Sequence, residues 1–325
     1  MRAAWYDRQG IAADVLEVGE LADPTIGAED LRVRVHLSGV NPGDTKKREG
    51  WLGSAMAFER VIPHSDASGT VESVGSAIDP DLVGRRVWVF GAQSYRPFGT
   101  AAEFVVVPRS LAVLLPDEVS DEVGASLGIP GITAHRAVFS DGPVAGRTVL
   151  VQGVLGGVSS LAAQLAHWAG ATVIGTVRRS TDLTRVDSSF VDHAVALDAD
   201  PAAAIRAIAP NGVDRIVEVA LSANGDLDAA VVANDAVIAT YFSSADRLDL
   251  PFSPFLFANV TLRFLGSDDF SPVAKADAAR DLTEAARVGA LHVHVDRILP
   301  LAEIAAAQDA VDSGAKGRVL VDVTA

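Results

Sequence analysis

The spacing of apolar residues changes at about residue 122. Before this point, short segments such as 31–37 and 69–75 alternate apolar and polar residues with a period of two, which is typical of half-exposed β-strands. Similar segments at 86–90 and 103–107 are set apart by turns that contain Gly or Pro. Many short strands with such turns predict a compact β-barrel.

After residue 122, patterns with helical spacing alternate with short apolar runs. This alternation is typical of a parallel, doubly wound sheet, in which helices connect successive strands. The strands that we expect are 148–151, 172–176, 194–197, 212–219 and 236–241, and the helices are 158–169, 202–208, 227–232 and 272–288. Toward the C-terminus, the pattern predicts strands at 293–295 and 318–323 and a helix at 301–312.

These patterns divide the chain into two domains. A length of 325 residues is enough for two domains that each bury a core of their own. We therefore predict an α/β protein. In it, a β-barrel domain formed by residues 1–122 and 290–325 is interrupted by a domain with a doubly wound parallel sheet, residues 123–289.

The segment 148–180 carries the most informative pattern in the chain. An apolar strand ends at a glycine turn, 153–157, and an amphipathic helix and a second strand follow. In such a unit the turn leaves open backbone N–H groups at the helix N-terminus, where they hold a pyrophosphate. We therefore expect a dinucleotide to bind here. The candidate binding residues in this unit are Gly153, Gly156, Gly157, Val158 and Thr176.

The glycine motif is incomplete, because its third position is Ser159. A glycine-rich turn in an unrelated α/β protein is therefore an alternative interpretation. The second strand is followed by Arg178 and Arg179 rather than by an acidic residue. Guanidinium groups at this point suit a 2′-phosphate, so we expect NADPH as the cofactor. The alternative is that both arginines are solvated charges beside the loop.

The composition excludes several kinds of site and partner. The chain has no cysteine, which rules out disulfides, thiolate zinc sites and cysteine nucleophiles. A formal net charge of −15 at pH 7 argues against nucleic acids and anionic membranes as partners. No apolar run approaches the ~20 residues of a membrane span. The N-terminus also lacks the apolar region of a secretory signal, so we expect a cytoplasmic protein.

Motifs of a known family occur along nearly the whole chain. They are found at 39–45 (GVNPGDT), 63–71 (PHSDASGTV), 131–134 (GITA), 153–158 (GVLGGV), 299–301 (LPL) and 314–318 (GAKGR). These segments resemble the medium-chain dehydrogenase/reductase superfamily, and within it the zinc-free quinone oxidoreductases related to ζ-crystallin. His64 stands where the second motif usually has Gly. The resemblance implies a GroES-like β-barrel domain and a Rossmann domain.

The resemblance also implies a metal-free oxidoreductase. Zinc alcohol dehydrogenases of the superfamily carry Cys at the position of Asn41 and His at that of Ser65, so no tetrahedral zinc site is expected here. The implied reaction is hydride transfer from NADPH to quinones or related α,β-unsaturated carbonyls. Asn41 is the candidate catalytic donor to the oxygen that gains charge. Asp44 is the second catalytic candidate; it orients Asn41, binds Lys46 or Lys47, or merely caps the loop.

Asn41, Pro42, Thr133 and Tyr241 complete the expected cofactor site. By resemblance, Thr133 lies on a helix that faces the nicotinamide, and Tyr241 ends the fifth strand of the sheet near the cofactor. Each has a structural alternative, since Asn41 can shape the turn before Pro42, Thr133 can pack in its helix and Tyr241 can be a core residue. Several relatives have Tyr where this chain has Lys46, which leaves Lys46 or solvent as the proton donor.

Two other functions remain open at this stage. One is a 2-enoyl thioester or enone reductase of the same superfamily, against which the scarcity of Tyr and the acidic balance count. The other is a non-catalytic NADPH-binding redox sensor. The expected partners are a small-molecule quinone or enone and further copies of the chain. By resemblance these copies form a homodimer or homotetramer through an edge strand at 261–264.

Overall fold

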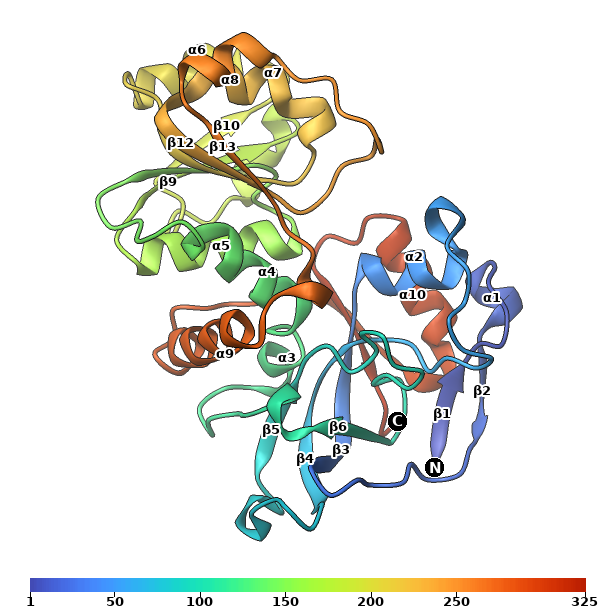
Figure 1. Ribbon diagram of the computed structural model, residues 1–325. Helices are drawn as coiled ribbons and strands as arrows, with labels where there is room; N and C mark the ends of the chain where they lie inside the picture. The colour runs from blue at the N-terminus through green and yellow to red at the C-terminus, as the bar shows by residue number, and fades with distance from the viewer. The chain divides into compact units, whose positions relative to one another are not determined.

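The computed structural model describes residues 1–325, apart from the side chain of Leu52. The chain forms two compact units, which are described separately (Figure 1). Unit 1 consists of residues 1–130, 279–287 and 293–325, and unit 2 of residues 131–278 and 288–292. The sequence pattern places the divisions at 122 and 290 instead.

One helix explains part of this difference in boundaries. The helix α9 (Pro272–Arg287) contributes its first residues to unit 2 and residues 279–287 to unit 1. Its Thr283 Oγ1 accepts a hydrogen bond of 3.1 Å from the indole N–H of Trp88, a fully buried residue of unit 1. The N–H group of a buried indole needs a hydrogen-bond acceptor. This contact therefore holds the C-terminal part of α9 against unit 1.

Unit 1 is built on a seven-stranded sheet. Its strands follow the order β14-β15-β3-β4-β5-β7, and β6 pairs with β3. The strands are β3 (Asp30–Val40), β4 (Asp66–Val74), β5 (Arg86–Val89), β6 (Phe104–Pro108), β7 (Ala112–Leu114), β14 (Val295–Pro300) and β15 (Arg318–Asp322), with β1 (Arg2–Trp5) and β2 (Glu17–Glu20) as a separate pair. The alternating residues Leu31, Val33 and Val35 of β3 are buried in one apolar core, which confirms the period-two prediction for this strand.

Unit 1 also contains four short helices, three of which begin within residues 1–122, where the sequence pattern indicated only strands. They are α1 (Ala12–Val15), α2 (Pro42–Glu49), α3 (Asp121–Gly124) and α10 (Ile304–Asp312). Helix α2 begins at Pro42, where a fixed φ suits the first helical position. The Asp44 carboxylate accepts the N–H of Asn41 at 2.8 Å, which is one half of a capping box. At its other end the helix stops at Gly50, whose φ is 78°.

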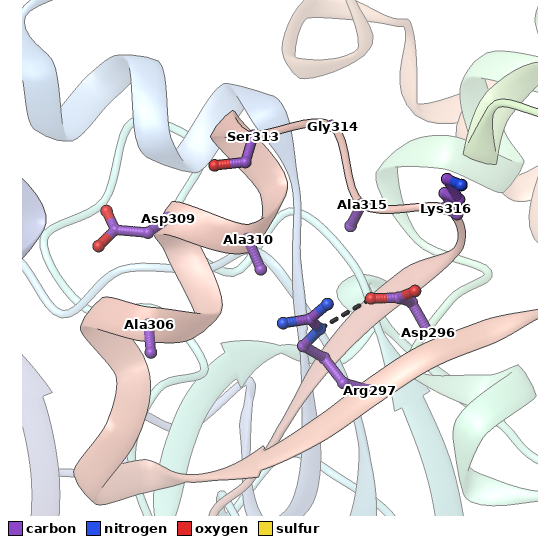
Figure 2. Close-up of a pocket in the computed structure, with 9 residues that line it drawn as sticks. All are labelled: Asp296, Arg297, Ala306, Asp309, Ala310, Ser313, Gly314, Ala315 and Lys316. Carbon is purple, nitrogen blue, oxygen red and sulfur yellow. Dashed lines mark hydrogen bonds and ion pairs between the residues drawn. The ribbon is translucent and has the colours of Figure 1, made fainter.

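A surface pocket of about 510 Å³ lies beside α10 in unit 1 (Figure 2). It is lined by Asp296, Arg297, Ala306, Asp309, Ala310, Ser313, Gly314, Ala315 and Lys316. Arg297 and Asp296 are already paired with each other at 2.7 Å. None of the residues predicted to bind a cofactor or act in catalysis lines this pocket.

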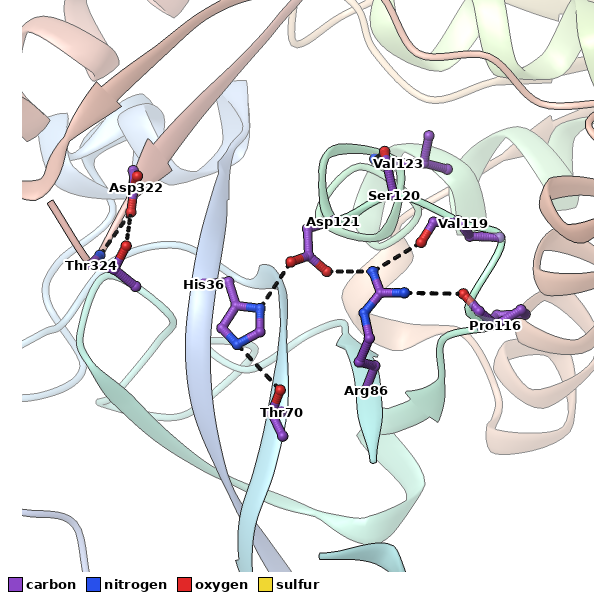
Figure 3. A network of polar contacts seen from close by, with 10 residues as sticks. All are labelled: His36, Thr70, Arg86, Pro116, Val119, Ser120, Asp121, Val123, Asp322 and Thr324. Carbon is purple, nitrogen blue, oxygen red and sulfur yellow. Dashed lines mark hydrogen bonds and ion pairs between the residues drawn. The ribbon is translucent and has the colours of Figure 1, made fainter. Parts of the chain in front are cut away.

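The connection that leads to α3 is fastened to the sheet by a polar network (Figure 3). The Asp121 carboxylate accepts hydrogen bonds of 2.7 Å from Arg86 and 2.9 Å from His36. Arg86 also donates to the carbonyl oxygens of Val119 and Pro116. Arg86 of β5 therefore binds this part of the chain at three points, which are two backbone carbonyl groups and the Asp121 carboxylate.

Unit 2 contains a six-stranded parallel sheet with the order β10-β9-β8-β11-β12-β13. The strands are β8 (Thr148–Val151), β9 (Thr172–Val177), β10 (His193–Ala196), β11 (Val213–Glu218), β12 (Val232–Thr240) and β13 (Thr261–Phe264). The helices are α4 (Ile129–Phe139), which begins in unit 1, α5 (Gly157–Trp168), α6 (Pro201–Ile208), α7 (Leu221–Val231) and α8 (Phe252–Phe257). This arrangement confirms the predicted α/β fold with a Rossmann-type sheet.

Two predicted elements are placed wrongly. The strand expected at 293–295 instead occupies Val295–Pro300, where it pairs with β15, and His292 and His294 lie in the segment before it. The helix expected at 227–232 already begins at Leu221. Its first five residues include Ser222, Asn224 and Gly225, which weaken the helical pattern. Tertiary contacts anchor this end, since Leu221 is buried and Asn224 donates to Glu218. None of the described helices combines the length and apolarity needed to cross a membrane.

Candidate functional site

The glycine turn of unit 2 joins β8 to α5 at the point where the strand order reverses. Gly153 has a φ of 63°, a backbone conformation that favours glycine. Gly156 is the N-cap of α5, and Gly157 is its first residue; both are exposed. The first N–H groups of a helix have no acceptor within the helix. The exposed turn therefore offers the N-terminal N–H groups of Gly157 and Val158 to an anion.

Thr176 has an internal role in this turn. Its Oγ1 accepts a hydrogen bond of 2.9 Å from the N–H of Gly153 and donates one of 2.7 Å to Oε1 of Gln152. The side chain is fully buried. Thr176 therefore holds the glycine turn against the end of β9, and it contacts other residues of the turn rather than its exposed face.

Gln152 and two buried acids extend this network, and the sequence analysis missed all three. Gln152 donates to Asp228 Oδ1 at 2.9 Å. Asp228 lies beside Glu218, which accepts from the N–H of Ala220 and from the Asn224 amide. Burial raises the pKa of both acids, and the Glu218 charge raises that of Asp228 further. Because Glu218 has more donors, we assign the charge to Glu218 and the proton to Asp228.

Ser159, at the third position of the glycine motif, is tied to two neighbours. Its hydroxyl donates to the carbonyl oxygen of Gln152 at 2.8 Å and is 2.8 Å from the hydroxyl of Tyr241. Burial raises the pKa of Tyr241 above its usual range. The hydroxyl of the predicted cofactor residue Tyr241 is thus bound to α5.

The tip of β9 carries three exposed or partly exposed arginines. Arg178 is exposed, and Arg179 is 3.5 Å from Asp182, which also pairs with Arg185 at 3.3 Å. The loop is anchored by Asp198, which accepts from the N–H and the hydroxyl of Ser180. The two predicted phosphate-binding arginines therefore lie at the surface, on a loop whose base is fixed.

In unit 1, the predicted residue Asn41 is fixed between two charged side chains. It directly follows the last residue of β3 and is the N-cap of α2. Its Nδ2 donates to Asp66 Oδ2 at 2.7 Å, and its Oδ1 accepts from Arg318 Nη1 at 2.9 Å. All three residues are buried. Pro42, the next residue, is exposed at the first position of the helix.

Asp44 lies beside this group and has an unusual pKa. Burial raises the pKa of its carboxyl to about 7, and the nearby Asp66 charge raises it too, against the lowering effects of Lys47 and Arg318. Burial lowers the pKa of Lys46, whose ammonium group lies 4.8 Å from the ring centroid of Trp51. Asn41, Pro42 and Asp44 thus share one loop and helix start.

A chain of buried hydrogen bonds connects His64 to the backbone carbonyl of Asp66. His64 Nδ1 is 3.0 Å from Ser38 Oγ, which is 2.7 Å from Thr100 Oγ1, and Thr100 donates to the carbonyl oxygen of Asp66. On its other side, His64 Nε2 is 3.2 Å from the Gln308 amide. Burial lowers the pKa of His64 to about 3, so the ring is neutral. Arg48 donates to Gln308 Oε1, so the Gln308 N–H group donates to His64 Nε2, which leaves the proton of the ring on Nδ1.

The last predicted site residue, Thr133, is buried on α4 in unit 2. The structure therefore groups the predicted residues into two sets, one around Asn41 in unit 1 and one around the glycine turn in unit 2. Asp66 and Arg318 were missed as site residues, although both lie in segments that resemble family motifs. The signal in the sequence was a charged residue at the start of a strand segment within such a motif.

Comparison with known proteins agrees with this arrangement. Residues 27–117 match the alcohol dehydrogenase GroES-like domain. The chain is 36% identical over 154 residues to the quinone oxidoreductase of Rattus norvegicus, covering 47% of this chain and 45% of that protein. It is 27% identical to the mycobacterial protein Rv1454c, solved in complex with NADPH, with a TM-score of 0.83 over 99% of both chains.

In sequence and fold the chain is similar to the medium-chain dehydrogenase/reductase superfamily. Within that superfamily, the curated relatives that it matches include quinone oxidoreductases. The fold is also that of an alcohol dehydrogenase superfamily protein from Novosphingobium aromaticivorans, with a TM-score of 0.88, 24% identity and 99% coverage of both chains. The chain spans about half the length of the curated relatives that it matches.

Proposed function

We propose that the protein is an NADPH-dependent reductase of quinones or related α,β-unsaturated carbonyls that works without a metal. The observation that carries the proposal is the fixed amide of Asn41, which stands where zinc enzymes of the superfamily have a thiolate ligand. An amide is a poor zinc ligand but a suitable donor to an oxygen that gains charge. Similarity to quinone oxidoreductases supports the same substrate class.

The glycine turn and the arginine tip of β9 support NADPH as the cofactor. NADPH, when bound, supplies the hydride. The N–H groups of Gly157 and Val158 would hold the pyrophosphate, and no side chain of Gly156 or Gly157 blocks their approach. Arg178 and Arg179 would hold the 2′-phosphate, since exposed guanidinium groups can form charge-assisted bonds with it.

The residues around Asn41 have a separate task. One amide hydrogen of Asn41 is bound to Asp66, and the second is the donor that we propose for the substrate oxygen. Such a donor stabilises charge that develops on the oxygen during reduction. The proton that completes the reduction comes from solvent or from Lys46, whose pKa is lowered by burial.

The proposal is tested by oxidation of NADPH and NADH with a panel of quinones, enones and enoyl-CoA. We expect turnover of quinones with NADPH. Replacing both arginines, in Arg178→Ala/Arg179→Ala, should raise KM for NADPH about tenfold or more and leave KM for NADH nearly unchanged, because one charge-assisted pair contributes ~1.5–3 kcal/mol. Arg185→Ala, on the same loop, is the matched control.

Three outcomes would contradict parts of this proposal. Equal losses with both cofactors would remove the 2′-phosphate role of the two arginines. Turnover confined to enoyl-CoA would replace the quinone reductase by a thioester reductase. NADPH binding without turnover of any substrate in the panel would favour a redox sensor.

A further inference from the structure

We infer that Asp66 and Arg318 are positioning residues that hold the side-chain amide of Asn41 in one orientation. The inference rests on the proposed function in one respect, namely that Asn41 donates a hydrogen bond to the substrate oxygen. Asp66 begins β4, Arg318 begins β15, and both strands flank β3, whose last residue, Val40, directly precedes Asn41. The pairing of these three strands thus places the Asp66 carboxylate and the Arg318 guanidinium on either side of the Asn41 amide.

The orientation of the amide follows from the two partners. A guanidinium only donates hydrogen bonds and a carboxylate only accepts them. Arg318 Nη1 is 2.9 Å from Asn41 Oδ1, and Asp66 Oδ2 is 2.7 Å from Asn41 Nδ2. A half-turn of the amide would set donor against donor and acceptor against acceptor. Because all three groups are buried, water does not compensate for that mismatch.

Neither partner is free to follow a turning amide. Both carboxylate oxygens of Asp66 accept the N–H of Ile129, at 2.9 and 3.0 Å. Gly128 leaves room for this carboxylate, since a Cβ there would lie 2.0 Å from Asp66 Oδ1. The Arg318 guanidinium fits beneath Gly39, where a Cβ would lie 2.8 Å from its Nη2. The Asn41 amide is therefore held by two partners that are fixed themselves.

The bonding of Arg318 argues against a purely structural role. Its Nη1 donates both to Asn41 Oδ1 and to the carbonyl oxygen of Val40. Among the described residues, its buried Nε and Nη2 have no hydrogen-bond partner. A buried guanidinium with unmade bonds costs stability. The bonds that it does make go to the last residue of β3, Val40, and to the proposed donor, Asn41.

A double-mutant cycle tests whether the two residues act through Asn41. We expect Asn41→Ala to lower kcat by up to ~100-fold, and Arg318→Met and Asp66→Asn each to lower it about tenfold or more. KM for NADPH should stay within about twofold. The double variant Asn41→Ala/Arg318→Met should lose no more than Asn41→Ala alone, because the target of Arg318 is already gone.

Control variants separate positioning from general damage. Arg318→Lys keeps a donor and should recover part of kcat. Arg297→Met, which removes another arginine of unit 1 that pairs with its neighbour Asp296, should leave kcat unchanged. Losses that multiply in the double variant, or full kcat in Arg318→Met, would overturn the inference.

A measurement without substrate keeps the inference separate from the proposed function. In ¹⁵N NMR of the full chain, the Asn41 side-chain signal is assigned by its absence in Asn41→Asp. We expect one of its two amide protons to exchange slowly and to shift downfield, as a bond to a carboxylate requires, and both effects to vanish in Asp66→Asn. Two rapidly exchanging protons in the wild-type protein would overturn the inference. Full turnover of Asn41→Ala with a protected proton would instead remove the catalytic role of Asn41.

Discussion

His64 shows how a single residue can depart from a family pattern and still fit. Its φ is 73°, a left-handed conformation that costs a residue with a side chain on the order of 1 kcal/mol. The motif usually has glycine here. The buried imidazole makes contacts that glycine lacks, with Ser38 on one side and Gln308 on the other. These bonds offset the backbone strain and connect α10 to the strands that carry Asn41 and Asp66.

Asp44 gives a pH-dependent prediction at the same scale. Its pKa of about 7 in the folded protein lies above the usual 3.8. The folded state therefore keeps a proton that the unfolded chain loses, so stability falls as pH rises from about 4 to about 7 and levels off above that. Asp44→Asn removes the charge and keeps an oxygen for the Asn41 N–H. Only the wild type then loses stability as pH rises. We therefore expect the Tm of Asp44→Asn minus that of the wild type to increase by a few degrees between pH 5 and pH 7.5.

The measurement is thermal unfolding across this pH range. The exposed Asp309→Asn, also in unit 1, serves as the control and should track the wild type. The charged groups that act on Asp44 are Lys47 on its own helix, Asp66 on β4 and Arg318 on β15. A constant gap between Asp44→Asn and the wild type would contradict the raised pKa.

At the scale of elements, the fold was predicted better than the site. Strand β3 and the unit from β8 to β9 followed from local patterns, because apolar spacing reports directly which face is buried. Helix α2 was missed even though Pro42 and Asp44 are helix-start signals. Asp66 and Arg318 were not predicted as site residues, because their contact depends on the pairing of β15 and β4 with β3. Strand pairing between distant segments leaves little trace in one sequence.

The link between α5 and β12 carries a prediction about this element pair. Ser159 and Tyr241 share a hydrogen bond of 2.8 Å, and such a bond stabilises a protein by about 1 kcal/mol. We expect Tyr241→Phe and Ser159→Ala each to lower the stability by roughly that amount, and the double variant to lose less than the sum. Because the Tyr241 hydroxyl is bound to Ser159, Tyr241→Phe should leave NADPH affinity unchanged in calorimetry.

Thermal unfolding and calorimetry of these three variants decide the role of Tyr241. A large loss of NADPH affinity in Tyr241→Phe, with little loss of stability, would make its hydroxyl a cofactor contact, as the sequence analysis proposed. Additive losses of stability would instead show that the two hydroxyls act independently.

At the scale of the whole molecule, one edge of the sheet in unit 2 is open. In the part of the chain that the structure describes, β13 pairs with β12 on one side and with no strand on the other. Phe264 on this strand and Phe257 on the preceding α8 are 67% and 81% exposed. An exposed edge strand with apolar neighbours favours pairing with another chain. We therefore propose that two copies associate through β13, by a two-fold axis that makes the contact identical for both.

Light scattering coupled to size-exclusion chromatography tests this association. We expect twice the mass of one chain, or a higher even multiple, for the wild type. Phe257→Lys/Phe264→Lys should give monomers, because two buried positive charges at a two-fold contact meet their own copies. Val273→Lys, which alters an exposed apolar residue of unit 2 outside β13 and α8, should keep the wild-type mass. If quinone turnover survives in the monomer, both sets of site residues belong to a single chain. A wild-type protein that stays monomeric at micromolar concentration would contradict the proposed association through β13.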